Sequence, residues 1–164
     1  MGYTTDFSGH VNIVPALNAA QVAYINQFSS TRRMKRKASV AAGFQDPVRE
    51  AVGLPIGLEG EFYVGNSANA GQDKDASIVE YNSPPSTQPG LWCQWVVSED
   101  GTKLEWDEGE KFYHYIEWME YMIKHFFDPW GYILNGHIDW QGEESEDEGT
   151  IEVIDNSVSH GVVR

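Results

Sequence analysis

The sequence predicts an α+β fold, namely a mainly antiparallel sheet of five or six strands with two principal helices packed on one face. Alternating apolar and polar residues, the pattern of half-buried strands, recur in five segments: 3–13, 60–65, 91–97, 102–107 and 136–153. Apolar residues at helical spacing occupy two longer segments, 18–33 and 110–127. The 164 residues and the apolar fraction of 41% suit a single domain, 1–164, with an ordinary hydrophobic core.

Hairpins are expected to join several of these strands. The opening strand contains Gly9, which predicts a bend or a bulge. Residues 91–97 and 102–107 flank a turn in which Gly101 can take a positive φ. The stretch GHIDWQGEESEDEGTIEV, 136–153, is predicted to be a closing hairpin.

Each predicted helix begins at a residue suited to capping. Asn18 predicts the start of a helix that runs to about residue 33, and Asp46 the start of a short helix. Asp107 and Glu110 have the spacing of a capping box before the helix over 110–127.

Two segments have neither a strand nor a helix pattern. Residues 66–90 contain three prolines and clustered serine, asparagine and glycine, which predicts a long irregular segment. Ile78, Val79 and Tyr81 indicate that part of it packs against the core. Residues 157–164 are predicted to be a loose C-terminal extension.

The helix over 110–127 carries two apolar stripes. Eight residues fall within one arc and form the expected core face: Phe112, Tyr115, Ile116, Met119, Met122, Ile123, Phe126 and Phe127. The opposite side carries a ring ridge, which is a candidate ligand-binding or partner-binding site: His114, Trp118, Tyr121 and His125. Because a soluble monomer rarely exposes so many rings, Trp118 is expected to be buried. Residues 66–90 are the preferred cover, and a second subunit or a small ligand are the alternatives.

The formal charge of −14 is unevenly distributed. Residues 1–49 hold six cations against two acids, +4, whereas residues 50–164 hold five cations against 23 acids, −18. The early cations include a candidate basic patch: Arg32, Arg33, Lys35, Arg36 and Lys37. Cations at the end of the first helix also suit the helix dipole, so both readings stay open. The overall charge disfavours nonspecific nucleic-acid binding and favours a basic protein surface as partner.

Five carboxylates crowd the tip of the closing hairpin: Glu143, Glu144, Glu146, Asp147 and Glu148. A metal site, a surface that mimics another polyanion and a turn kept soluble by charge are the three readings of this acidic tip. The calcium-loop pattern is absent, since the acids do not alternate and no glycine stands at the sixth position. The acidic tip is therefore expected to be a partner-binding surface whose side chains point into water.

No catalytic, cofactor or metal motif stands out. Cys93 is the single cysteine, the five histidines have no His-x-x-x-His spacing, and no glycine-rich phosphate-binding run occurs, so neither a metal nor a cofactor is expected. His137 and Asp139 share the polar face of one strand, with Glu152 expected on its neighbour. Such a trio could relay protons.

Several stretches resemble a group of small uncharacterised proteins found in phages and bacterial genomes: GYTTDFSGHVNI, SSTRRMKR, GLWCQW, EKFYHYIEW and GYILNGHIDWQGEE. The resemblance covers most of the chain and brings no activity with it. It implies a small protein of a mobile element that acts on a host machine. Neither a signal sequence nor an apolar run of about 18 residues is present, which predicts a cytoplasmic protein, in the host cytoplasm if it is phage-encoded.

The preferred functional prediction is a non-enzymatic acidic interaction protein, such as a phage-encoded inhibitor of a host protein or a polyanion mimic. The alternative is a small-ligand-binding protein that uses the ring ridge. A hydrolase-type enzyme that uses His137 and Asp139 is third. A homo-oligomer is an open alternative to a monomer.

Overall fold

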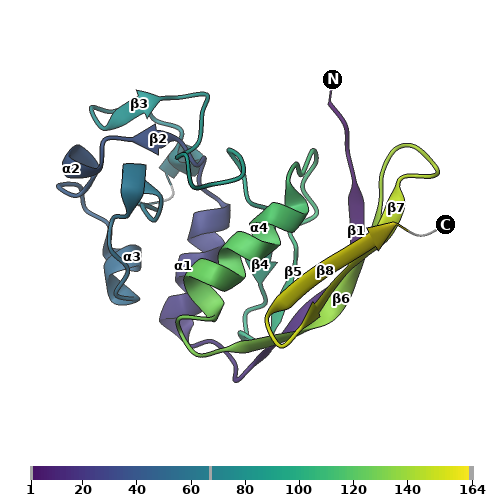
Figure 1. The fold of residues 1–164 in the computed structure, drawn as a ribbon. Coiled ribbons are helices and arrows are strands. Elements are labelled where there is room, and N and C mark those ends of the chain that lie inside the picture. Colours follow the sequence, from purple (N-terminus) through teal and green to yellow (C-terminus); the bar gives the residue numbers. More distant parts are fainter. Residues whose placement is uncertain (1, 67, 163–164) are drawn as a thin grey trace. The chain divides into compact units, whose positions relative to one another are not determined.

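The computed structural model describes residues 2–66 and 68–162. The chain is α+β, as predicted (Figure 1). It divides into two compact units: unit 1 comprises Met1–Asn18 and Gln94–Arg164, and unit 2 comprises Ala19–Cys93. The single domain stays a prediction.

Unit 1 contains a six-stranded antiparallel sheet. In order across the sheet its strands are β4 (Trp95–Val97), β5 (Lys103–Trp106), β1 (Asp6–Val14), β6 (Ile133–Gln141), β7 (Glu148–Ile154) and β8 (Ser157–Val162). The predicted number of strands is confirmed, but one strand was misplaced. Residues 60–65 form turns, and the expected loose extension instead provides β8 as far as Val162. Residues 163–164 lie outside the described residues.

Alternation of apolar and polar residues gives this sheet one buried side and one solvent-facing side. Along β6, the buried residues Leu134 and Ile138 alternate with exposed His137 and Asp139. β1 pairs with β6 over all nine of its residues, and the register is continuous through Gly9, so the expected bulge is absent. Gly9 has a φ of +96°, and a Cβ there would lie 2.7 Å from the carbonyl oxygen of His137. Close backbone approach therefore explains the glycine.

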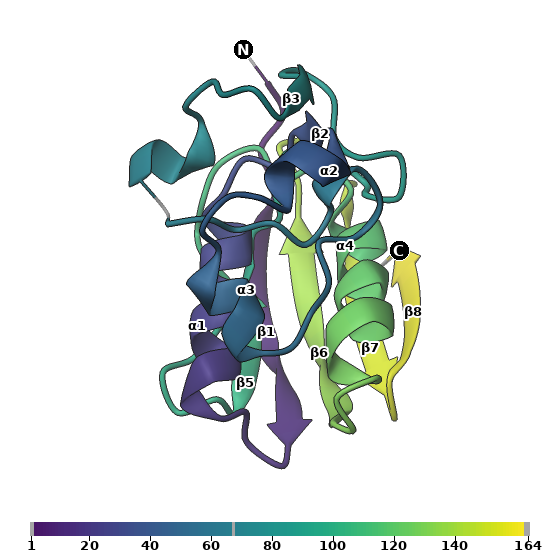
Figure 2. The ribbon, with the colours of Figure 1, turned by 90° about the vertical axis from the view of Figure 1, so that its left-hand side faces the viewer.

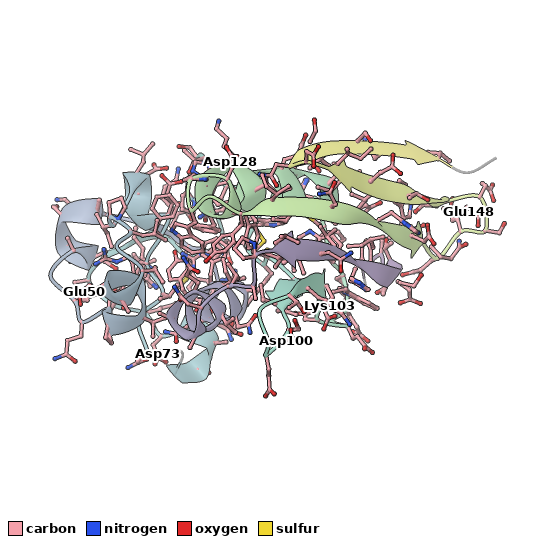
Figure 3. All side chains as sticks on the ribbon, turned by 90° about the horizontal axis from the view of Figure 1, so that it is seen from below. Glu50, Asp73, Asp100, Lys103, Asp128 and Glu148 are labelled. Carbon is pink, nitrogen blue, oxygen red and sulfur yellow. The ribbon has the colours of Figure 1, made fainter. Side chains whose placement is uncertain are left out.

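The turn between β4 and β5 forms as predicted. Asp100 accepts hydrogen bonds of 2.6 to 3.0 Å from the hydroxyls of Thr102 and Ser98 and from the Thr102 amide. These bonds lower the pKa of Asp100 to about 2. Gly101 takes a φ of +75°, which the turn requires. Figure 3 labels Asp100 and Lys103 at this turn.

The helix predicted over 110–127 begins later and changes pitch. α4 (Tyr115–Met122) continues as a π-helical segment, η3 (Ile123–Phe127), and α4 lies over one face of the sheet (Figures 1 and 2). The predicted capping box of Asp107 and Glu110 is wrong. His114 has a left-handed φ of +58°, which is incompatible with a right-handed helix. The helix therefore begins after His114. Asp107 instead accepts a 2.7 Å hydrogen bond from the Gly109 amide.

The predicted core face of this helix is confirmed, since six of its eight residues are buried and Tyr115 and Ile116 are half-buried. The Tyr115 ring centroid lies 4.9 Å from that of Phe7 and 5.6 Å from that of Trp140. Trp95 donates its indole N–H to the Tyr115 carbonyl oxygen at 2.9 Å. Aromatic pairs of this kind contribute about 0.5–1.5 kcal/mol each beyond their burial. Burial raises the pKa of Tyr115 to about 12.

Unit 2 is built from short elements: α1 (Ala19–Ser29), β2 (Lys35–Arg36), α2 (Ala38–Ala41), α3 (Pro47–Ala51), η1 (Leu58–Gly60), η2 (Ala68–Gly71) and β3 (Ile78–Glu80). The first helix ends before residue 33. The hydroxyls of Ser30 and Thr31 bind carbonyl oxygens of its last turn, those of Asn26 and Gln27. β2 and β3 pair antiparallel, so part of the irregular segment 66–90 is structured.

Asp46 binds the backbone at the end of residues 60–65, where a strand was predicted. Its buried carboxylate does not cap α3 and instead binds Arg49 Nε at 2.6 Å. The other carboxylate oxygen accepts the amide N–H groups of Val64 and Gly65, at 3.3 and 2.8 Å. These amides are therefore satisfied by a side chain, as buried N–H groups must be, and do not enter a ladder.

Candidate interaction surface

The acidic tip joins β6 to β7, and hydrogen bonds brace its backbone. The Gly142 amide donates to the Asp147 carbonyl at 2.7 Å, and the Asp147 amide donates to the Glu144 carbonyl at 3.0 Å. The side-chain amide of Gln141 contacts three carbonyl oxygens of the loop at 3.0 to 3.3 Å. Glu148 marks this end of the hairpin in Figure 3.

Asp147 does not belong to the solvated part of the tip. One carboxylate oxygen accepts the Tyr3 hydroxyl at 2.6 Å, and the other accepts the Trp140 indole N–H at 3.3 Å. The Tyr3 hydroxyl in turn accepts the Glu144 amide at 3.2 Å. The hydrogen bond to Asp147 is the main cause of the raised pKa of Tyr3. Asp147 thus anchors the loop, and the expectation that it points into water is wrong.

The remaining carboxylates of the tip are more open. The Glu143 carboxylate accepts the Thr4 amide, and Glu148 is half-buried. Glu143, Glu144 and Glu146 are exposed, which confirms the expectation for these three. Within residues 2–66 and 68–162, no group of three or more His, Cys, Asp or Glu side chains is placed to hold a metal ion. The tip therefore presents exposed carboxylates on a loop that hydrogen bonds hold in place.

His137, Asp139 and Glu152 all lie on the solvent-facing side of the sheet. His137 stands opposite Glu152 on β7 and opposite His10 on β1, as a cross-strand cluster requires. Asp139 stands opposite Thr150 and accepts its hydroxyl at 2.8 Å. The predicted neighbourhood is confirmed, but all three are exposed on an open sheet. Proton relay by these residues stays a prediction.

The ring ridge is mostly inside the protein. Trp118 has no exposed surface and Tyr121 only 6%, whereas His114 is exposed and His125 half-buried. The Tyr121 ring lies 5.4 Å from Trp118 and 4.2 Å from His125, measured between centroids. The predicted burial of Trp118 is confirmed, and its cover by residues 66–90 stays a prediction. The ridge is not an open binding face.

α4 lies beside β8, the outermost strand of the sheet (Figures 1 and 2). Side chains of both elements line a groove between them. One hollow of about 360 Å³ is lined by Ile116, Glu117, Glu120, Val158, Ser159 and His160. A second hollow of about 430 Å³ shares Glu120 and Val158 and extends to Lys124 and Asp128. The two hollows therefore adjoin along β8.

The sequence prediction missed this groove because β8 was read as an extension. A signal was present in the dipeptide Asp155-Asn156, which has positive φ at both residues, 46° and 71°. Such a dipeptide between two alternating segments is a typical two-residue hairpin turn. Val158 and Val162 continue the alternation after it.

The candidate basic patch belongs to unit 2, and most of its charge is used internally. Arg33 and Arg36 are only 3% and 4% exposed. The patch makes these contacts: Arg32 with Tyr81 and Asn82, Arg33 with the carbonyls of Glu61 and Tyr63, Lys35 with Glu59, and Arg36 with Asp75 and Ser77. The helix-dipole reading is wrong, because α1 ends at Ser29 before the first of these cations. Lys37 is the exposed member.

The two units differ sharply in charge. Unit 1 contains eighteen acidic and four basic residues, a formal charge of −14, which equals that of the whole chain. Unit 2 contains seven of each and is neutral. Dividing the sequence at residue 49 does not reveal this difference in charge, because unit 1 contains residues from both ends of the chain.

Comparisons of the chain with protein-family models, with curated proteins and with solved structures found no match. No helix in the described part of the chain has the length and apolar character needed to cross a bilayer.

Proposed function

We propose that this chain is a non-enzymatic acidic interaction protein that binds a basic surface of another protein through unit 1. The observation that carries the proposal is the partition of charge: unit 1 carries −14, whereas unit 2 is neutral. A solubilising role alone would not require all of the excess charge in one unit. An inhibitor encoded by a phage, or a polyanion mimic, is the form of this function that the resemblance implies.

The braced acidic tip supports this proposal. Asp147 and Tyr3 hold the loop, so Glu144 and Glu146 are presented without a large ordering cost on binding. Exposed charges of one sign steer association with an oppositely charged partner and make it sensitive to salt. Binding should therefore be fast and should weaken as ionic strength rises.

The test compares two variants with the same change in net charge. The tip variant is Glu144→Gln/Glu146→Gln/Glu148→Gln, which spares the anchor Asp147. The matched control is Glu99→Gln/Glu108→Gln/Glu110→Gln, three acids that are exposed elsewhere in unit 1. Immobilised wild type and both variants are incubated with bacterial lysate at low and high salt, and the retained proteins are quantified by mass spectrometry.

We expect at least one basic protein to be retained by the wild type and by the control, but not by the tip variant. Its retention should fall at high salt. Equal retention by the tip variant and the control would contradict a role for the tip. Retention of no protein by the wild type, at either salt concentration, would contradict the proposed function itself.

A further inference from the structure

We propose that β8 and the groove beside α4 bind an extended, lysine- or arginine-rich segment of the partner protein as an additional strand. We call β8 and this groove the edge site. The proposal rests on the proposed function, because it states where a basic partner binds and in what conformation. Its evidence is separate from the acidic tip: it depends on strand geometry and on the walls of the groove.

The backbone of β8 is arranged to accept a strand. Within residues 2–66 and 68–162, β8 has a strand neighbour on one side only, β7, with Ile154 opposite Ser157 next to the two-residue turn. Hydrogen-bonded pairs alternate along an antiparallel ladder from such a turn. Val158, His160 and Val162 therefore direct their N–H and C=O groups away from β7, toward the open edge. Adding a strand to groups of this kind is a common way to bind an extended peptide.

β8 lacks the features that usually protect an edge. Proteins commonly shield edge strands with lysine, proline, a bulge or a very short strand. The described part of β8 contains no lysine and no proline, and its register with β7 is regular over all six residues. The opposite edge of the sheet, β4, is only three residues long and is protected by its shortness. A regular, unprotected edge beside a groove indicates a docking site.

The walls of the groove select the charge of the occupant. Val158 and His160 stand opposite Val153 and Ile151, so their side chains lie on the side of the sheet that faces α4. Glu117 and Glu120 of α4 form the facing wall. Every second side chain of an added strand would point to the side of the sheet that faces α4. A Lys or Arg side chain there can reach the carboxylates of Glu117 and Glu120, while its methylene groups cover Val158.

A second copy of this protein is the less favourable occupant. Pairing two β8 edges would bring together two units that each carry −14, at a distance where such charges repel. A basic segment instead neutralises charge as it binds. The charge of unit 1 thus favours the extended basic segment over self-association.

The test uses a defined probe, a short fluorescent peptide of alternating lysine and valine. Binding is followed by fluorescence anisotropy, and amide hydrogen exchange is measured with and without peptide. We expect the amides of His160 and Val162 to become protected at saturating peptide. A peptide of alternating glutamate and valine should not bind, and methylation of alternate backbone nitrogens of the lysine peptide should abolish binding.

Variants then separate the edge from the tip. His160→Pro removes an outward N–H without removing a bond to β7, and Glu117→Gln/Glu120→Gln removes the acidic wall. Each should weaken peptide binding by about threefold to tenfold. The tip variant Glu144→Gln/Glu146→Gln/Glu148→Gln should leave it nearly unchanged. Far-UV circular dichroism shows whether each variant is folded, and the exchange measurement on the wild type needs no variant.

The outcomes distinguish the two proposals. If the peptide binds but the tip variant loses it while the edge variants keep it, the edge proposal is overturned and an acidic interaction surface at the tip stands. If the His160 and Val162 amides stay unprotected at saturating peptide, or no peptide binds, the edge proposal is also overturned. An increase in the size of the free protein with concentration, lost in His160→Pro, would make a second copy the occupant instead.

Discussion

Asp46 is expected to be one of the residues on which unit 2 depends most. Its side chain is completely buried, contacts Arg49 Nε at 2.6 Å and accepts the amides of Val64 and Gly65. The Arg49 side chain is only 11% exposed, and Asp46→Ala removes its counter-ion. Removing one partner of a buried pair costs about 3–5 kcal/mol. We expect a loss in this range, because the two amides also lose their acceptor.

Related variants divide this loss into its parts. Asp46→Asn keeps a carbonyl oxygen for Val64 and Gly65 but removes the charge, so the loss should be smaller, about 1–3 kcal/mol. Asp46→Ala/Arg49→Met removes the stranded cation and should be more stable than Asp46→Ala alone. Glu50→Ala is the control on the same helix, since Glu50 is exposed (Figure 3). It should change stability by less than about 0.5 kcal/mol.

Urea denaturation followed by circular dichroism measures these differences, and hydrogen exchange at the Val64 and Gly65 amides assigns them to unit 2. A loss for Asp46→Ala no larger than that for Glu50→Ala would refute the reasoning. So would a double variant no more stable than Asp46→Ala, because the stranded charge would then not be the cause.

Four further predictions concern unit 1. The pKa of Asp100 is lowered to about 2, so the stability that it contributes is present above the unfolded value of 3.8 and is lost as the pH falls toward 2. A carboxyl NMR titration should show this, and Asp100→Asn should flatten the acid limb of the stability curve. Tyr3→Phe should accelerate exchange of the Glu144 amide, which loses its acceptor. A Cβ at Gly149 would lie 2.5 Å from the Trp140 ring, so Gly149→Ala should lower the stability measured in a thermal melt by about 1–3 kcal/mol. Gly161→Ala is the control and should not, because a Cβ at Gly161 would have no atom within 4 Å. Trp118→Ala should cost about 3–5 kcal/mol, and size-exclusion chromatography shows whether it also changes the oligomer size.

Local patterns in the sequence were enough to predict the fold class and much of unit 1. Alternation identified β1 and both hairpin strands on either side of Gly101, since a period of two depends only on successive residues. Helical spacing identified the core face of α4 for the same reason. The burial of Trp118 followed from the number of rings on the opposite side. Each of these features is a property of neighbouring residues in the chain.

Contacts between distant residues decided the rest. Asp46 binds the amides of Val64 and Gly65, eighteen and nineteen positions away, in the segment 60–65 that was predicted to be a strand. Tyr3 lies 144 positions from Asp147, and their hydrogen bond changes one member of the acidic tip from a solvated charge into an anchor. Arg36 is buried and pairs with Asp75, 39 positions away, so it adds no charge to a surface patch.

The arrangement of the sheet was also a tertiary outcome. β1 lies between β5 and β6, strands from the second half of the chain, and alternation does not specify which strands become neighbours in a sheet. The distribution of charge also depends on the fold. The acidic residues are evident in the sequence, but only the division into units shows that unit 1 carries the whole net charge of −14. The type of a residue is read directly from the sequence, whereas its burial and its contacts depend on which distant segments pack beside it. For this reason the sequence by itself determined most of the strands and the helix face, and the tertiary structure alone decided which charged side chains are exposed.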